Sequence, residues 1–310
     1  MAWGSWRDQN FFDCRCKCHA IIKDMKKIDL GAQYIAAHLA MFRCPVCEAP
    51  YTKIEVHTLV CPNGHTLDLN KKGSATFLKH NVETEYDTPM LASRRKMLTA
   101  GLFAPIVHAV AKQLPETPQR ILDVGTGEGT PLAQLDERRQ CDEDVLIGFD
   151  LSKAGINLAT QLVSKAFFCV ADLAQLPFND HVFDVVMEFF SPSAYREFER
   201  VCRPGGQVIK VVPNANYLIE LRHALYDQTA PQYQYANDRV VELFAEHYPN
   251  MTQTKVRYDF PIGGEWIKDM MAMTPLSWGS DEPHRSQLLR EPVESVTVDV
   301  SVLTATLPKR

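Results

Sequence analysis

Short apolar runs alternate with longer amphipathic segments through the middle of this chain, from residue 120 to residue 213. Runs of this length, rich in Val, Ile and Phe, are typical of strands that are buried on both faces in a parallel sheet with helical connections. We therefore predict an α/β domain built on a parallel sheet. The predicted strands are residues 121–124, 145–149, 166–170, 182–187 and 207–212.

Beyond Pro213 the pattern changes to a longer helical stretch and then to two further strands. Residues 254–260 look strand-like, residues 265–273 have helical spacing, and residues 295–307 alternate between apolar and polar. Any fold assignment for this chain has to accommodate that closing pair of strands.

The first 40 residues are unlike the rest of the chain. They contain three alternate-residue cysteines and a histidine between Cys14 and His19, without a distant partner pair that would complete a metal site. We interpret residues 1–40 as a disordered extension or an over-called start, and we assign them no function.

Three further parts follow that extension. Residues 41–80 hold short β-type runs around Cys-Pro and Asn-Gly turns, too few to bury a core of their own, so a metal would hold this part together. Residues 81–118 read as a helical linker, with helical spacing over 89–114. The α/β domain then takes residues 119–310.

The composition is that of a soluble globular protein, with 45% hydrophobic and 23% charged residues. No apolar run approaches the ~20 residues that span a bilayer. Lysines and arginines interrupt the apolar stretches near the N-terminus, which argues against a signal peptide. The nine cysteines fit a reducing compartment, where thiols bind metals rather than pair. We therefore expect a cytoplasmic protein with no membrane segment.

Charge is distributed unevenly along the chain. The net charge is −5, but the first 120 residues carry +5 and the remainder carries −10. A mildly basic front end on an acidic body is compatible with docking of the front end on RNA.

Four residues near the front have the spacing of a zinc site. Two residues separate Cys44 from Cys47, so both thiolates can turn toward one ion, and Cys61 and His65 supply a second pair. A closed set of three cysteines and one histidine is typical of structural zinc, because catalytic zinc keeps one position open. His57 is an alternative ligand, although it lies in the middle of a predicted strand.

A glycine turn follows the first strand of the α/β domain, in the sequence Ile-Leu-Asp-Val-Gly-Thr-Gly-Glu-Gly at 121–129. Glycines at the carboxyl end of a strand let the backbone approach a nucleotide-type ligand closely. Asp150 ends the second strand, where a carboxylate can accept both ribose hydroxyls, and Asp172 ends the third, where it can accept an adenine amino group. Both features have alternative interpretations. Dinucleotide enzymes use a related glycine turn, and an acidic residue after a strand is often only a helix cap.

The order of these features resembles the class I S-adenosylmethionine (SAM)-dependent methyltransferases over residues 120–212. Asp123 precedes the glycines within the strand, and a Leu-Pro-Phe run at 176–178 follows the third strand, unlike the usual nicotinamide enzymes. The resemblance implies a Rossmann-like sheet of seven strands, completed by the two late strands, with SAM as the cofactor. The predicted zinc ribbon would precede this domain.

Over residues 41–307 the chain resembles the bacterial 23S rRNA guanine-N1 methyltransferases, which modify a hairpin loop near the peptide exit tunnel. Besides the ribbon, the resemblance rests on Ala-Ser-Arg-Arg at 92–95, Ala-Gly-Leu-Phe at 100–103, Asn-Tyr-Leu-Ile-Glu-Leu at 216–221 and Met-Thr-Pro-Leu-Ser-Trp at 273–278. It implies methyl transfer to a guanine of a 23S rRNA hairpin, and a homodimer with a cleft between the ribbons. The threonine of the glycine loop resembles the Gram-positive branch, some members of which confer macrolide resistance.

The same resemblance implies the residues around the cofactor. At positions 103 and 217, where this chain has Phe and Tyr, other branches of the family often have Tyr and His. Core packing is the alternative role for Phe103. The expected cofactor-binding residues are Phe103, Asp123, Gly125, Gly127, Gly129, Thr130, Asp150, Asp172, Leu173 and Tyr217.

The target base is expected at the end of the fourth strand. There Glu188 is the candidate acceptor of the guanine N1 proton, and Phe189 or Phe190 would stack on the base, with core packing as the alternative for both aromatics. Three consecutive basic residues are candidates for RNA phosphate contact, with a solvated helix face as the alternative: Arg94, Arg95 and Lys96.

Two other functions compete with rRNA methylation. The first is a small-molecule methyltransferase with an incidental ribbon, which would need a large apolar cap that residues 41–118 do not supply. The second is a non-enzymatic, zinc-dependent assembly factor that binds rRNA, against which the intact glycine loop and both acidic strand ends argue.

Overall fold

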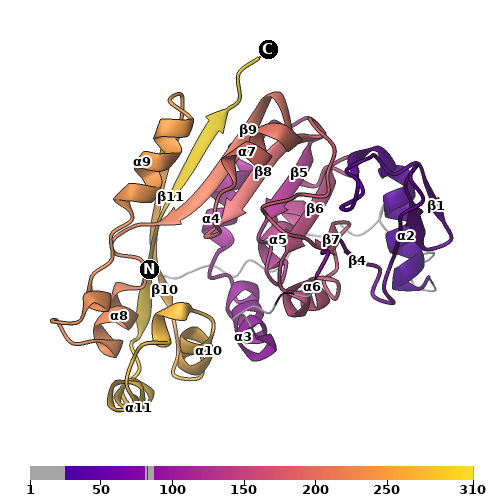
Figure 1. The fold of residues 1–310 in the computed structure, drawn as a ribbon. Coiled ribbons are helices and arrows are strands. Elements are labelled where there is room, and N and C mark those ends of the chain that lie inside the picture. Colours follow the sequence, from indigo (N-terminus) through magenta and orange to yellow (C-terminus); the bar gives the residue numbers. More distant parts are fainter. Residues whose placement is uncertain (1–24, 81, 83–86, 310) are drawn as a thin grey trace, which may run out of the picture.

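Figure 1 shows the computed structural model, which describes residues 25–80, 82 and 87–309. One eight-stranded sheet runs through the molecule, and a separate three-stranded sheet belongs to the N-terminal part. The large sheet has the order β10-β11-β9-β8-β5-β6-β7-β4. Its strands are β4 (Ala75–Thr76), β5 (Arg120–Val124), β6 (Val145–Asp150), β7 (Phe167–Val170), β8 (Phe183–Phe189), β9 (Cys202–Pro213), β10 (Thr252–Pro261) and β11 (Ser295–Thr306).

The seven strands from β5 to β11 confirm the predicted Rossmann-like sheet. β5, β6, β7, β8 and β9 pair in parallel, whereas β11 lies antiparallel between β9 and β10. The order places the glycine loop after β5 at the centre of the sheet, beside the ends of β6 and β8. Ligands of open α/β sheets bind at such a point.

Alternate residues of the central strands point to opposite faces of the sheet, and each face has its own core. Ile121 belongs to one hydrophobic cluster and Leu122 to the other. Helices contribute to both clusters. The first includes residues of α3 (Thr88–Thr99), α4 (Ala104–Ala111), α5, α6, α8, α10 and α11, and the second includes residues of α2 (Lys27–Ala37), α7 and α9. The helices after β5 are α5 (Thr130–Arg139), α6 (Lys153–Ala159), α7 (Tyr195–Val201), α8 (Ile219–Leu225), η2 (Pro231–Tyr233), α9 (Asp238–His247), α10 (Ile267–Ala272), η3 (Pro275–Ser277) and α11 (Glu282–Arg290).

The prediction of an extension over residues 1–40 is wrong for its last part, which forms α2 (Lys27–Ala37) and η1 (Leu39–Met41). Ile35 is fully buried, and the hydroxyl of Tyr34 donates a 2.9 Å hydrogen bond to the backbone oxygen of Leu146 in β6. α2 therefore covers part of the main sheet. Residues 1–24, which include the cysteines at 14–18, lie outside the described residues.

The predicted ribbon forms a three-stranded antiparallel sheet of β1 (Lys53–Glu55), β2 (Thr58–Val60) and β3 (Thr66–Asp68). Phe42, Tyr51 and Leu59 are buried in the same cluster as the second face of the main sheet. β4 then pairs in parallel with β7, which makes it the eighth strand of the large sheet. The ribbon thus shares a core with the α/β domain instead of standing apart from it.

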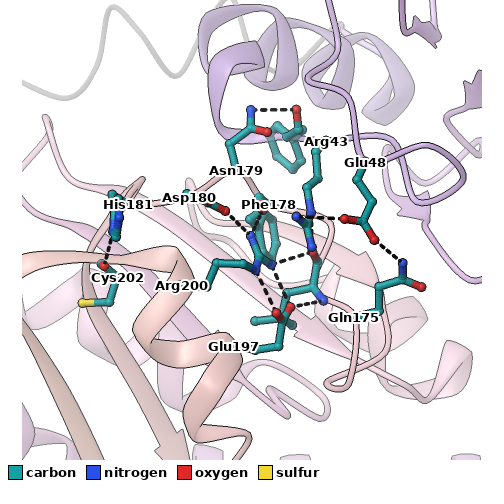
Figure 2. Close-up of polar contacts among 12 residues, drawn as sticks. Arg43, Glu48, Gln175, Phe178, Asn179, Asp180, His181, Glu197, Arg200 and Cys202 are labelled. Atoms are coloured by element: carbon teal, nitrogen blue, oxygen red, sulfur yellow. Dashed lines mark hydrogen bonds and ion pairs between the residues drawn. The ribbon is translucent and has the colours of Figure 1, made fainter. Parts of the chain in front are cut away.

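Polar contacts also join the ribbon to the segment that follows β7 (Figure 2). Arg43 donates from Nε to the backbone oxygen of Leu176 at 3.3 Å, and Asn179 donates to the backbone oxygen of Ala40 at 2.8 Å. Arg200 of α7 donates to the backbone oxygen of Phe178 at 2.6 Å from the other side. Arg43 thus donates to the loop, the loop residue Asn179 donates back to Ala40, and Arg200 holds the loop from α7, so these contacts fix the N-terminal part against the domain.

The predicted helical linker over 89–114 forms two helices, α3 (Thr88–Thr99) and α4 (Ala104–Ala111). The break between them includes Gly101, whose φ of +103° suits glycine alone. Both helices contribute fully buried side chains to the first core, among them Met97 and Ile106. Among the described residues, no helix is both long and apolar enough to cross a bilayer.

Candidate active site

The four predicted zinc ligands lie together at the tip of the ribbon. The ligand atoms of Cys44, Cys47, Cys61 and His65 all lie within 4.8 Å of one another. The sulfur atoms of Cys47 and Cys61 are 3.7 Å apart, and a hydrogen bond from the backbone of Ala49 lowers the pKa of Cys47 to about 6. Three thiols and one imidazole at this separation fit a tetrahedral zinc ion.

The alternative zinc ligand His57 has another partner. Its Nε2 atom lies 2.7 Å from a carboxylate oxygen of Asp29 in α2. This contact joins the ribbon to α2 and leaves the ligand set at three cysteines and one histidine.

The glycine loop between β5 and α5 has the backbone shape that only glycine adopts easily. Gly125, Gly127 and Gly129 have φ values of +67°, +58° and +86°. A Cβ on Gly125 would lie 2.8 Å from the Cβ of Ser191, and one on Gly129 would lie 2.9 Å from the Cβ of Ala159. A Cβ on Gly127 would instead meet no atom within 4 Å, so this residue faces open space.

A cavity of about 930 Å³ opens at the carboxyl ends of β5, β6 and β7. It contains most of the expected cofactor contacts and continues past β8 to residues of α8 and η3. Six of the ten predicted cofactor residues line it: Gly125, Gly127, Asp150, Asp172, Leu173 and Tyr217.

Asp150 is positioned by its own neighbourhood at the end of β6. The backbone N–H groups of Gly127 and Ser152 donate to its two carboxylate oxygens at 2.8 and 2.7 Å. Burial raises the pKa of Asp150, and these hydrogen bonds oppose that effect. Each carboxylate oxygen can accept a second hydrogen bond, so Asp150 can still bind a pair of hydroxyls in the cavity.

The other four predicted cofactor residues support the loop without lining the cavity: Phe103, Asp123, Gly129 and Thr130. Asp123 is 2% exposed and accepts a 2.5 Å hydrogen bond from the Thr126 hydroxyl, and burial raises its pKa to about 7. The Thr130 hydroxyl donates to Glu128 at 2.6 Å. Phe103 is fully buried, with its ring centre 5.3 Å from that of Phe190.

The three consecutive basic residues of α3 have three different environments. Arg94 lines the cavity, with its guanidinium carbon 5.4 Å from the ring centre of Phe103. Arg95 donates to the carboxylate of buried Glu128 at 3.0 Å, and thereby holds the glycine loop. Lys96 is more exposed and pairs with Asp269 of α10 at 3.1 Å. Two of the three predicted phosphate contacts are therefore engaged within the protein.

The residues at the end of β8 also divide between two faces. Phe189 and Phe190 line the cavity. Glu188 does not; it is fully buried, pairs with Lys210 of β9 at 3.1 Å, and accepts a hydrogen bond from Ser193 at 2.7 Å. Burial raises the pKa of Glu188 against the opposing effect of the Lys210 cation. The candidate proton acceptor thus lies on the face away from the cavity.

Apart from Tyr217, sequence reasoning missed the far wall of the cavity, which is formed by residues after β9. They belong to α8, the loop around η2, and the Met-Thr-Pro-Leu segment at 273–276, which was noted only as part of the family resemblance. The polar residues of this wall are Arg222, Tyr226, Gln232 and Tyr235.

Comparisons with known proteins agree with this geometry. The family description "Methyltransferase domain" matches residues 122–210. The chain is 36% identical over 277 residues to the Bacillus subtilis (strain 168) protein "Putative 23S rRNA (guanine-N(1)-)-methyltransferase YxjB", a match that covers 85% of this chain and 96% of that protein. This chain belongs to the 23S rRNA (guanine-N1)-methyltransferase family.

A second relative extends the comparison to another organism. The family member "23S rRNA (guanine(748)-N(1))-methyltransferase" of Streptomyces fradiae is 29% identical over 268 residues, covering 84% of this chain and 94% of that protein. By contrast, the "Demethylmenaquinone methyltransferase" of Roseiflexus castenholzii matches only 38% of this chain and 54% of its own length, at 31% identity. The guanine-N1 methyltransferase family therefore accounts for far more of the chain than the small-molecule alternative does.

Proposed function

We propose that this chain transfers the methyl group of SAM to N1 of a guanine in a hairpin loop of 23S rRNA. The observation that carries the proposal is the single cavity that joins the glycine loop to the wall of polar and aromatic residues after β9. Ligand pockets measure about 300–1,000 Å³. A cavity of about 930 Å³, at the top of that range, suits a cofactor together with one flipped base.

The cofactor would lie at the end of the cavity formed by the glycine loop. Gly127 faces open space there, Asp150 has acceptor capacity for the ribose hydroxyls, and Asp172 and Leu173 at the end of β7 suit the adenine ring. SAM supplies a methyl group on a reactive sulfonium. The residues of this chain then have to position the acceptor atom in line with that methyl group and exclude water.

The ribbon would grip the RNA, held together by a zinc ion on its four ligands. Two observations support this role. The ribbon shares a core with the α/β domain, and Arg43 contacts the segment after β7, which includes Asp172 of the cofactor end of the cavity. RNA bound to the ribbon would therefore be held at a set distance from the cofactor. The homodimer that the family resemblance implies stays a prediction. Light scattering on the purified chain tests it by measuring the molar mass in solution.

Methyl transfer from labelled SAM to a panel of acceptors tests this proposal. The panel holds a 23S rRNA hairpin that contains guanine 748, the same hairpin with that guanine replaced by adenine, and quinol acceptors. Guanine 748 comes first because it is the position in the name of the Streptomyces relative. We expect label only in the guanine hairpin. Label in a quinol, or equal label in both hairpins, would overturn the proposal.

A further inference from the structure

The far wall of the cavity contains an arginine whose surroundings call for a ligand. Arg222 lies on α8, lines the cavity and is 9% exposed. Its Nη1 atom donates to the backbone oxygen of Gln232 at 2.6 Å, and its guanidinium carbon lies 5.2 Å from the ring centre of Tyr235. The loop around η2 therefore holds one edge and one face of the guanidinium in a defined orientation.

The opposite edge of that guanidinium has no partner within the described part of the chain. Nε of Arg222 is buried without a hydrogen bond, Nη2 donates to no described residue, and no described carboxylate lies within ion-pair distance. Burial accordingly lowers the pKa of Arg222. In the same protein, the Nε–Nη2 edges of Arg120, Arg139 and Arg200 each hold one carboxylate.

A buried cation with two unpaired donors, on a residue that lines a cavity, calls for acceptors from a ligand. Guanine offers two acceptors side by side, O6 and N7, and a bidentate arginine is the commonest specific contact with them. Adenine instead presents an amino group where guanine has O6, so it would set donor against donor. The edge of Arg222 therefore matches guanine and rejects adenine.

We infer that Arg222 binds O6 and N7 of the target guanine and stabilises the negative charge that loss of the N1 proton places on O6. This inference rests on the proposed function. N1 releases its proton to water, and the negative charge is shared between N1 and O6. The N1 electron pair then forms the bond to the methyl carbon while the bond from that carbon to sulfur breaks, and its electrons stay on the sulfur of S-adenosylhomocysteine. Arg222 acts on the deprotonated base and exchanges no proton itself.

Single-turnover methylation of the hairpin by three full-length variants tests the inference. Arg222→Gln removes the charge, Arg222→Lys keeps the charge but not the fork, and Arg290→Gln changes an exposed arginine at the end of α11 as the matched control. Loss of one preorganised donor to a developing oxyanion costs about 100- to 1,000-fold in rate. We expect that loss for Arg222→Gln, a smaller loss for Arg222→Lys, and none for Arg290→Gln, with the Kd for SAM within threefold throughout.

A hairpin with 6-thioguanine at the target position separates chemistry from folding. Sulfur accepts hydrogen bonds weakly and makes the N1 proton more acidic, so the ratio of wild-type to Arg222→Gln rates should fall below about 10. A ratio that stays near the guanine value would overturn the inference, as would wild-type rates for Arg222→Gln or a weakened affinity for SAM. Absence of methylation by the wild-type chain would instead overturn the proposed function itself, and the inference with it.

Discussion

Variants of the buried pair of Glu188 and Lys210 can show whether Glu188 has a structural role or a catalytic one. Their side chains are 0% and 4% exposed and lie 3.1 Å apart. Lys210→Met would leave the Glu188 carboxylate buried without its counter-charge, and breaking such a pair costs about 3–5 kcal/mol. At about 2 °C per kcal/mol in a chain of this size, the melting temperature should fall by about 6–10 °C.

The double variant Glu188→Gln with Lys210→Met removes both charges and should recover most of that stability. Urea unfolding of the wild type, both single variants and the double variant measures the coupling. Methyl transfer to the hairpin, corrected for the folded fraction, then measures catalysis. We expect the double variant to stay within tenfold of the wild-type rate, because Glu188 does not line the cavity.

General bases contribute about 100- to 10,000-fold. A double variant that melts normally but loses more than 100-fold in rate would make Glu188 the base after all. A cost below about 1 kcal/mol for Lys210→Met would refute the buried-pair argument.

Three further predictions concern the metal and the cofactor loop. Cys44→Ser should remove the zinc, which atomic absorption measures. Because the ribbon shares its core with the sheet, the ribbon and the α/β domain should still unfold in one transition, at a lower melting temperature. A separate transition for the ribbon would contradict this. Asp150→Asn should raise the Kd for SAM about 10- to 100-fold by calorimetry, since hydrogen bonds to charged groups contribute about 1.5–3 kcal/mol; an unchanged Kd would remove Asp150 from the site. Asp123, with its pKa raised to about 7, stabilises the fold most below pH 4 and loses that contribution as the pH rises to about 7. Unfolding free energies of the wild type and Asp123→Asn should therefore diverge by up to about 4 kcal/mol across that range, and parallel pH curves would contradict the assignment.

The main sheet and its cofactor edge could be predicted because their signals are local. Strands buried on both faces leave continuous apolar runs, and the glycines of 125–129 are required by positive φ values that other residues adopt at a cost. The spacing of the zinc ligands is equally local, and the structure brings all four ligand atoms together. In each case a few neighbouring residues carry the information.

The features that were missed depend on contacts between distant segments. α2 buries only a small face. Gly31 passes so close to Gly73 that a Cβ on Gly31 would clash with the carbonyl oxygen of Gly73, and no periodic pattern reveals that approach. Arg94, Arg95 and Lys96 look alike in sequence, yet helical geometry turns them toward the cavity, Glu128 and Asp269. Glu128 lies 33 residues from Arg95 and Asp269 lies 173 residues from Lys96, so no local pattern reveals these pairs.

Primer extension across the methylated hairpin, with mass spectrometry of the digested nucleosides, tests the central claim most directly. A methyl group on N1 blocks Watson–Crick pairing, so reverse transcriptase should stop next to one loop guanine, and 1-methylguanosine should be the only new nucleoside. The Asp150→Asn variant, with its weakened cofactor site, should give a much fainter stop under the same conditions. A methylated nucleoside other than 1-methylguanosine, or label in the hairpin without a stop at a guanine, would contradict the account.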